Sequence, residues 1–205
     1  MKKDIPVKKN NIYRVSITGM GTKGEGIGKI DNFTIFIPGA ILGEEVEVNI
    51  IKVNKNYAVG KLLNIIIASE ERVKPICDIY TRCGGCQLQH MSYKEQLNFK
   101  RQKVKDALLR LGGIDVEVEP VLGIKNPYRY RNKVQLPIGK ENEKVSIGFY
   151  APRSHNIIDL KTCLIQDEKA DDIIKILREW IKEFNVPIYN EKEHKGNLRH
   201  IMVRT

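Results

Sequence analysis

The chain has 205 residues, 41% of them hydrophobic, and carries a formal net charge of +10. This length is enough for one or two domains with packed cores. No apolar run approaches the roughly 20 residues of a membrane span, and the N-terminal residues lack the apolar core of a signal peptide. A membrane-spanning or secreted class is therefore excluded, and we expect a cytoplasmic monomer that makes no contact with membranes.

The basic charge is concentrated in the middle of the chain. Residues 71–135 carry 13 basic and 7 acidic side chains, against 10 and 7 in residues 1–70 and 12 and 11 in residues 136–205. Nucleic acid is the commonest partner of such a surface, and a solvated basic face is the alternative.

The first seventy residues show the period of short β-strands. Apolar and polar positions alternate in four segments that Gly and Asn clusters separate: YRVSITG, FTIFIP, EEVEVNIIK and YAVGKLLNI. Short strands at this spacing, with no helix between them, indicate a closed β-barrel of the oligonucleotide-binding type over residues 1–68.

The segment from Gly19 to Gly24 matches the dinucleotide-binding pattern GxGxxG. That function needs a helix directly after the glycines, so that its N-terminus can hold a pyrophosphate. The residues that follow, EGIGKIDNFTIFIP, are glycine-rich and then strand-like. We reject a nucleotide site and expect these glycines to permit tight turns and close backbone approach, including approach to an RNA backbone.

Residues 8–67 resemble a TRAM domain, a small RNA-binding β-barrel attached to several RNA-modifying enzymes. The glycine-rich turn, the FIPGAILGE stretch and the basic strand ending in YAVGKL carry the resemblance. It implies RNA binding, and because the domain also occurs alone, it does not fix the activity.

Three of the four cysteines, Cys77, Cys83 and Cys86, lie within ten residues, and Cys163 follows far downstream. In a reducing compartment such cysteines serve as ligands or catalytic groups rather than bridges. A structural zinc site usually presents two close pairs, whereas three ligands in one loop with a distant fourth are more typical of an iron–sulfur cluster. Zinc and unligated thiols remain alternatives. His90 and His155 are candidate replacement ligands, although such histidines are more often simply hydrogen-bonded.

The residues from 69 to 205 predict an α+β domain. A helix begins after Ser92, with Glu95 completing a capping box and an apolar stripe of Leu97, Val104, Leu108 and Leu111. Lys100 and Arg101 lie elsewhere on this helix, where they contact RNA phosphates or form a solvated face. A second helix spans Asp167 to Phe184, and its expected core face is Ile173, Leu177, Trp180 and Phe184.

Strands are predicted in NPYRYRNKVQLPIGK, in KVSIGFY and in NLRHIMVRT, the first two joined by a polar turn near Glu141–Lys144. In YRYRNK, three cations would share one strand face: Arg129, Arg131 and Lys133. Aromatic residues between cations can stack unpaired bases while the cations hold phosphates. We expect RNA contact here, with an edge strand protected by charge as the alternative.

The segments CDIYTRCGGCQLQHMSYKEQLNFKRQKV and IGFYAPRSHNIIDLKTCLIQ resemble the bacterial ribosomal RNA uracil-5-methyltransferases. That family joins a TRAM barrel, a central domain with a 4Fe–4S cluster and a C-terminal Rossmann-like domain. The resemblance covers essentially the whole chain and implies a 23S rRNA substrate, although some cluster-bearing relatives act on tRNA. It also implies four cluster ligands, which are Cys77, Cys83, Cys86 and Cys163.

In that family a cysteine thiolate adds to C6 of uracil, S-adenosylmethionine methylates C5, and a carboxylate removes the C5 proton. These groups belong to the C-terminal domain. This chain ends at Thr205 without a βαβ pattern, and the resemblance implies that all of its cysteines are cluster ligands. We therefore expect an N-terminal fragment, inactive alone, with no catalytic residue and with S-adenosylmethionine bound by the parent enzyme only. The alternatives are a non-catalytic RNA-binding module with a structural metal and a tRNA uracil-5-methyltransferase.

Overall fold

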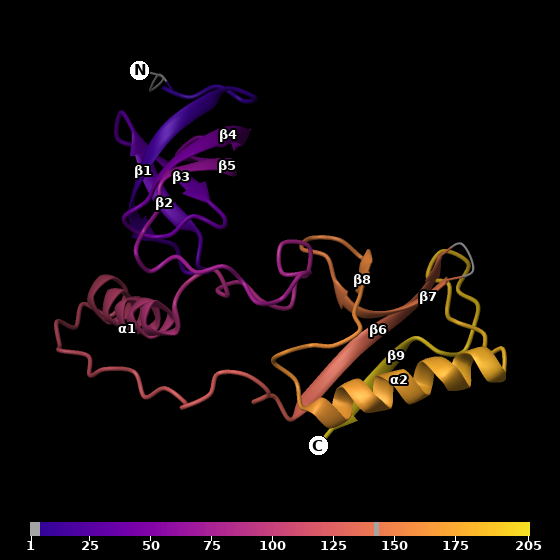
Figure 1. Ribbon diagram of the computed structural model, residues 1–205. Coiled ribbons are helices and arrows are strands. Elements are labelled where there is room, and N and C mark those ends of the chain that lie inside the picture. The colour runs from indigo at the N-terminus through magenta and orange to yellow at the C-terminus, as the bar shows by residue number, and fades with distance from the viewer. Residues whose placement is uncertain (1–4, 142–143) are drawn as a thin grey trace. The chain divides into compact units, whose positions relative to one another are not determined.

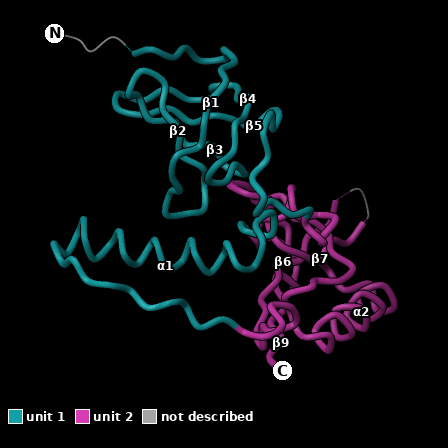
Figure 2. The backbone as a smooth tube through the Cα atoms, turned by 60° about the vertical axis from the view of Figure 1, so that its left-hand side comes forward, with its two compact units in different colours: residues 1–74, 87–123 teal, residues 75–86, 124–205 magenta. Residues whose placement is uncertain are grey.

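A computed structural model describes residues 5–141 and 144–205. The chain forms two compact units that are both built from separated segments. Unit 1 contains the chain up to residue 74 together with residues 87–123, and unit 2 contains residues 75–86 and 124–205 (Figure 2). The short segment that carries three of the cysteines thus belongs to unit 2, although unit 1 residues flank it on both sides.

Five strands form a closed barrel in unit 1, in the order β1-β2-β3-β5-β4. They are β1 (Ile12–Met20), β2 (Gly26–Ile30), β3 (Phe33–Ile37), β4 (Glu45–Val53) and β5 (Tyr57–Ile67). The pairing of β3 with β5 is parallel and the others are antiparallel. The predicted small barrel is therefore confirmed.

The barrel core follows the period-2 pattern of its strands. On β4, Val46, Val48 and Ile50 are fully buried and alternate with more exposed residues. At Gly28 a Cβ would lie 2.2 Å from Cγ1 of Val15, so only glycine lets β2 approach β1 this closely. After Gly24 the chain enters β2, so the strand expected after the GxGxxG match is confirmed and the helix that a dinucleotide site needs does not follow it.

An ion pair ties the segment after the barrel to the barrel itself. Glu44 is buried and accepts hydrogen bonds from the Ile41 amide, at 2.9 Å, and from the Arg72 guanidinium. Arg72 also donates to the Gly39 carbonyl at 2.6 Å. An antiparallel bridge joins Arg72 to Met91, which lies just before the next helix. Arg72 therefore links the barrel to the start of that helix.

Helix α1 (Tyr93–Arg110) begins where the sequence predicts, with the Ser92 hydroxyl accepting from the Glu95 amide at 3.1 Å. The second hydrogen bond of the predicted capping box, from the Ser92 amide to the Glu95 side chain, is wrong, because the Ser92 amide donates instead to the Glu71 carbonyl. The predicted apolar stripe is also wrong in part. Phe99 is the buried residue of the helix, whereas Val104 is exposed and Leu111, at its end, is 88% exposed.

Unit 2 is an antiparallel sheet of four strands in the order β8-β7-β6-β9, with one helix packed on it (Figure 1). The elements are β6 (Lys133–Glu141), β7 (Lys144–Tyr150), β8 (Ile157–Asp159), α2 (Glu168–Glu183) and β9 (His200–Arg204). The polar turn predicted between the first two strands includes residues 142 and 143, which lie outside the described residues.

Helix α2 has the predicted ends, with Asp167 as N-cap and Phe184 as C-cap, but packs through a different face. Its buried residues are Ala170, Ile174 and Ile181, and Leu177 packs partly against the same core. The other members of the predicted core face, Ile173, Trp180 and Phe184, are exposed. The apolar residues form one wide stripe, and the sheet covers the edge of it that carries Ala170, Ile174 and Ile181, so the periodicity could not identify which edge is buried. No helix in the described part of the chain is long and apolar enough to cross a membrane.

Candidate cysteine-ligand site

The four cysteines lie in unit 2, in two segments that the sequence separates widely. We call residues 77–86 the cysteine loop and residues 162–166 the Cys163 turn. Burial raises the pKa of the Cys83 thiol, and the nearby charges of Cys163 and Cys77 raise it further. Burial likewise raises the pKa of Cys163, with a further contribution from Cys86. Ile79 of the loop and Cys163 of the turn also pack against the same hydrophobic core.

Two glycines let the cysteine loop lie against the end of β7. The Gly84 amide donates to the Tyr150 carbonyl at 2.9 Å, and a Cβ on Gly84 would lie 2.6 Å from that oxygen. A Cβ on Gly85 would lie 3.2 Å from the Phe149 ring. A larger residue at Gly84 would therefore push the loop away from the strand, whereas one at Gly85 would require a small shift of the Phe149 ring.

Backbone amides point at two of the sulfur atoms. The Gly85 amide donates to Sγ of Cys83 at 3.4 Å. The amides of Ile165 and Gln166 hydrogen-bond to the Cys163 thiol, and they lower its pKa against the larger effect of burial. Amide donors stabilise a thiolate, which is the form that binds metals. Because burial outweighs them here, metal binding at this site would release protons.

The donor set suits an iron–sulfur cluster in its chemistry. Within residues 5–141 and 144–205, no three Cys, His, Asp or Glu side chains are arranged to hold a metal ion. A zinc site gathers four ligands tightly around one ion, whereas a 4Fe–4S cluster takes one thiolate at each of four irons. Thiols are the donor type of the second kind of group, and amide donors reach two of the four sulfurs, those of Cys83 and Cys163.

The two histidines considered as replacement ligands have other roles. His90 is buried in unit 1, among Arg72 and Glu44, and burial together with the Arg72 charge lowers its pKa to about 4. His155 belongs to unit 2, where its ring stacks on Tyr150 and its Nδ1 lies 3.0 Å from the Glu191 carboxylate.

The cations predicted to contact RNA fall into different environments. Strand β6 begins at Lys133, so the expectation of three cations on one strand face is wrong. Arg129 precedes the strand with a φ of 56°, and its guanidinium donates to the Cys163 carbonyl at 2.8 Å. Arg131 is half-buried and its amide donates to the Ile165 carbonyl. Lys133 is exposed and pairs across the sheet with Arg204, a cation that the sequence pattern did not connect with it.

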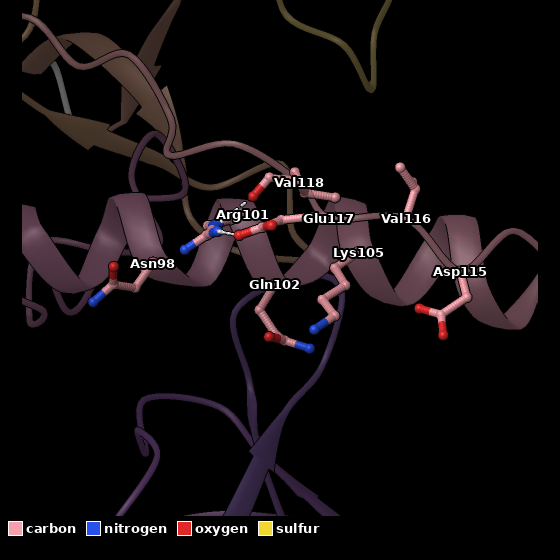
Figure 3. Close-up of a pocket in the computed structure, with 8 residues that line it drawn as sticks. All are labelled: Asn98, Arg101, Gln102, Lys105, Asp115, Val116, Glu117 and Val118. Carbon is pink, nitrogen blue, oxygen red and sulfur yellow. Dashed lines mark hydrogen bonds and ion pairs between the residues drawn. The ribbon is translucent and has the colours of Figure 1, made fainter.

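On helix α1, Lys100 is exposed, whereas Arg101 is engaged with the segment that runs back along the helix. Its Nε donates to the Val118 carbonyl at 2.6 Å, and its Nη2 lies 3.8 Å from the Glu117 carboxylate. These residues line a hollow of about 590 Å³ together with Lys105 and Asp115 (Figure 3). Charges of both signs surround this hollow, which does not single it out as a phosphate site.

Comparison with known proteins identifies the barrel. Residues 6–63 match the TRAM domain. The match covers the barrel from before β1 into β5, and it agrees with the closed five-stranded topology.

Over its whole length the chain is similar to proteins described as RNA methyltransferases. An "Uncharacterized RNA methyltransferase" of Clostridium tetani is 86% identical over 205 residues, which are 100% of this chain and 45% of the relative. A second such protein, of Clostridium acetobutylicum, is 54% identical over 207 residues, again 45% of the relative. The chain thus spans just under half the length of these relatives.

One solved structure is similar to both units. The Pyrococcus abyssi tRNA (uracil-54, C5)-methyltransferase, in complex with S-adenosyl-L-homocysteine, matches with a TM-score of 0.68 and 30% identity. The match covers 93% of this chain and 42% of that chain.

Proposed function

We propose that the chain is the RNA-recognition and cluster-binding part of an RNA uracil-C5 methyltransferase that uses S-adenosylmethionine. The observation that carries the proposal is that the cysteine loop and Cys163 belong to the same compact unit, where Ile79 of the loop and Cys163 pack against one core. The TRAM match and the similarity to RNA methyltransferases support it. The methyl-transfer site would lie in the part of the relatives that this chain does not match, and the cytoplasm is where such a substrate is met.

A 4Fe–4S cluster is the proposed cofactor of these residues, and when bound it would join the two segments covalently. Its ligands would be Cys77, Cys83, Cys86 and Cys163. The chain's own contribution is to place the sulfurs: Gly84 fixes the loop on β7, and the amides of Gly85 and Ile165 stabilise thiolates. Because a preformed site is absent from an unfolded chain, cluster binding would also stabilise unit 2.

RNA is the proposed partner, bound by the barrel and by exposed groups of unit 2. Tyr128 and Tyr130 are exposed ahead of β6, and Lys133 follows them at its start. Exposed rings can stack unpaired bases while cations hold phosphates. On helix α1, Lys100 is available in the same way, whereas Arg129 and Arg101 are occupied within the protein.

The proposed substrate is 23S rRNA, which the cysteine set favours through the family it resembles. A tRNA is the second candidate, because the similar solved structure is that of a tRNA (uracil-54, C5)-methyltransferase. Competition binding with a 23S rRNA transcript and a tRNA transcript at equal salt separates them. Tighter binding of the tRNA would reverse the order of the two candidates.

The metal content tests the proposal against a non-catalytic RNA-binding module with a structural metal. Protein purified without air should contain about four irons and four acid-labile sulfides per chain. Replacing Cys163 by Ser should remove the visible colour and destabilise unit 2. Stoichiometric zinc without labile sulfide would reject the cluster and favour the module.

A further inference from the structure

The carboxylate of Asp171, in the first turn of α2, is a hub for the Cys163 turn. It accepts hydrogen bonds from the Thr162 hydroxyl at 2.7 Å, the Cys163 amide at 3.1 Å and the Gln166 side-chain amide at 2.5 Å. Arg129 donates to the same carboxylate at 2.7 Å. One partly buried acid therefore holds both ends of the turn.

The guanidinium of Arg129 closes the turn from the other side. Its Nη1 donates to the carbonyls of Cys163, at 2.8 Å, and Gln166, at 3.2 Å, while its Nη2 donates to Thr162 Oγ1 at 3.2 Å. Its own amide donates to the Leu164 carbonyl at 2.9 Å. The side chain of Arg129 is 27% exposed, so these contacts are shielded from water in part.

Arg129 holds this position with a strained backbone. Its φ of 56° lies in the left-handed region, which is unfavourable for a residue with a Cβ. Such a conformation persists when surrounding contacts over-determine it. Here those contacts are with the Cys163 turn and with two acids of the first turn of α2, Asp171 and Glu168, whose Oε1 lies 3.7 Å from Arg129 Nε.

The Cys163 sulfur needs such non-local support more than the other three do. The cysteine loop fixes Cys77, Cys83 and Cys86 relative to one another through its own short backbone. Cys163 arrives from a segment far along the chain, and its orientation depends on contacts that sequence neighbours cannot supply.

We infer that Arg129 and Asp171 are positioning residues that clamp the Cys163 turn and aim its sulfur toward the cysteine loop. The inference rests on the proposed cluster, and it assigns Arg129 to the ligand site rather than to RNA. The clamp acts through the Cys163 turn, because the Arg129 guanidinium donates to carbonyls and a hydroxyl of the turn and to the Asp171 carboxylate.

The test compares wild type with Arg129→Met, Arg129→Lys and the matched control Arg131→Met, all purified without air. Iron and labile sulfide per chain are measured, followed by the rate at which the visible colour bleaches in air. Outer hydrogen-bond partners of metal ligands typically contribute 10–100-fold in affinity, so Arg129→Met should bleach about tenfold faster. Arg129→Lys keeps the charge and lacks the planar fork, so it should still bleach faster than Arg131→Met. Wild-type bleaching in both Arg129 variants would overturn the clamp.

A second measurement separates the clamp from the cluster. If wild type contains no iron and sulfide, the proposed cluster fails, and the clamp is then tested on the metal-free protein by alkylating its thiols. Arg129→Met should raise the alkylation rate of Cys163, because the turn loses its hydrogen bonds, and should leave the rate of Cys77 unchanged. Equal changes at both cysteines, or none, would show that Arg129 does not hold the turn.

Discussion

His90 lies buried in unit 1 within the electrostatic reach of Arg72 and Glu44. Burial, and after it the Arg72 charge, lowers the pKa of this imidazole to about 4, against about 6.5 in an unfolded chain. Between these two values the unfolded chain binds a proton that the folded chain does not. The contribution of His90 to the free energy of unfolding is therefore fully present above about pH 6.5 and is lost as the pH falls toward about 4.

Replacing His90 by Gln should flatten this pH dependence. In wild type the group contributes a slope of at most about 1.4 kcal/mol per pH unit across the window. Urea unfolding at about pH 7 and about pH 5 measures it, and the variant should lose less stability between the two. An equal loss in both proteins would mean that another group causes the acid sensitivity.

Gly84 gives a second single-residue prediction. A methyl group at this position would lie 2.6 Å from the Tyr150 carbonyl oxygen, so Gly84→Ala should destabilise unit 2 by about 1–3 kcal/mol. The matched control is Gly19→Ala, whose new methyl group has its nearest neighbour at 3.9 Å. Urea midpoints compare the two, and a Gly84→Ala protein as stable as the control would contradict the observed loop packing.

Helix α2 shows what a sequence can predict about an element. Its N-cap could be recognised from the local sequence, because the Asp167 side chain accepts a hydrogen bond from the Lys169 amide as an N-cap does. Its buried face could not, since Ile173 and Ile174 are adjacent and equally apolar, and only the sheet decides between them. The surroundings of Arg129 could not be predicted for the same reason. Its contacts come from α2 and the Cys163 turn, and no pattern in YRYRNK encodes them.

The two faces of α2 should respond differently to the same substitution. Ile174 is 1% exposed, so Ile174→Ala should cost about 2–5 kcal/mol through a cavity against the sheet. Ile176 is 64% exposed, and Ile176→Ala should change stability by no more than about 0.5 kcal/mol. Thermal unfolding of the two variants checks this, and similar losses would place the wrong face against the sheet.

At the scale of the whole molecule, the spacing of alternating segments predicted the barrel, because strand period is a local signal, whereas the set of four cysteine ligands stays a prediction. The grouping of residues 75–86 with residues 124–205 was not predictable, because it depends on contacts across long stretches of sequence. The predicted division near residue 68 stays a prediction, since compactness describes packing and not independent folding.

RNA binding gives the prediction at this scale. Replacing Arg131 and Lys133 together by Gln should weaken RNA binding and lower the salt slope by up to about two units, because each phosphate contact contributes roughly one. Lys182→Gln with Lys192→Gln removes the same charge from other exposed positions and should leave the slope unchanged. Filter-binding titrations over a range of salt measure both, and identical slopes would move the interface to the barrel.

The interleaving of the two units has a consequence for the order of events during synthesis. The cysteine loop leaves the ribosome early, and Cys163 follows 77 residues after Cys86. At about 5–20 residues per second, three thiols would wait roughly 4–15 s for the fourth. A cluster with these four ligands could therefore be completed only after most of the 205 residues have emerged, and until then the nascent loop would be exposed to oxidation and to competing metals.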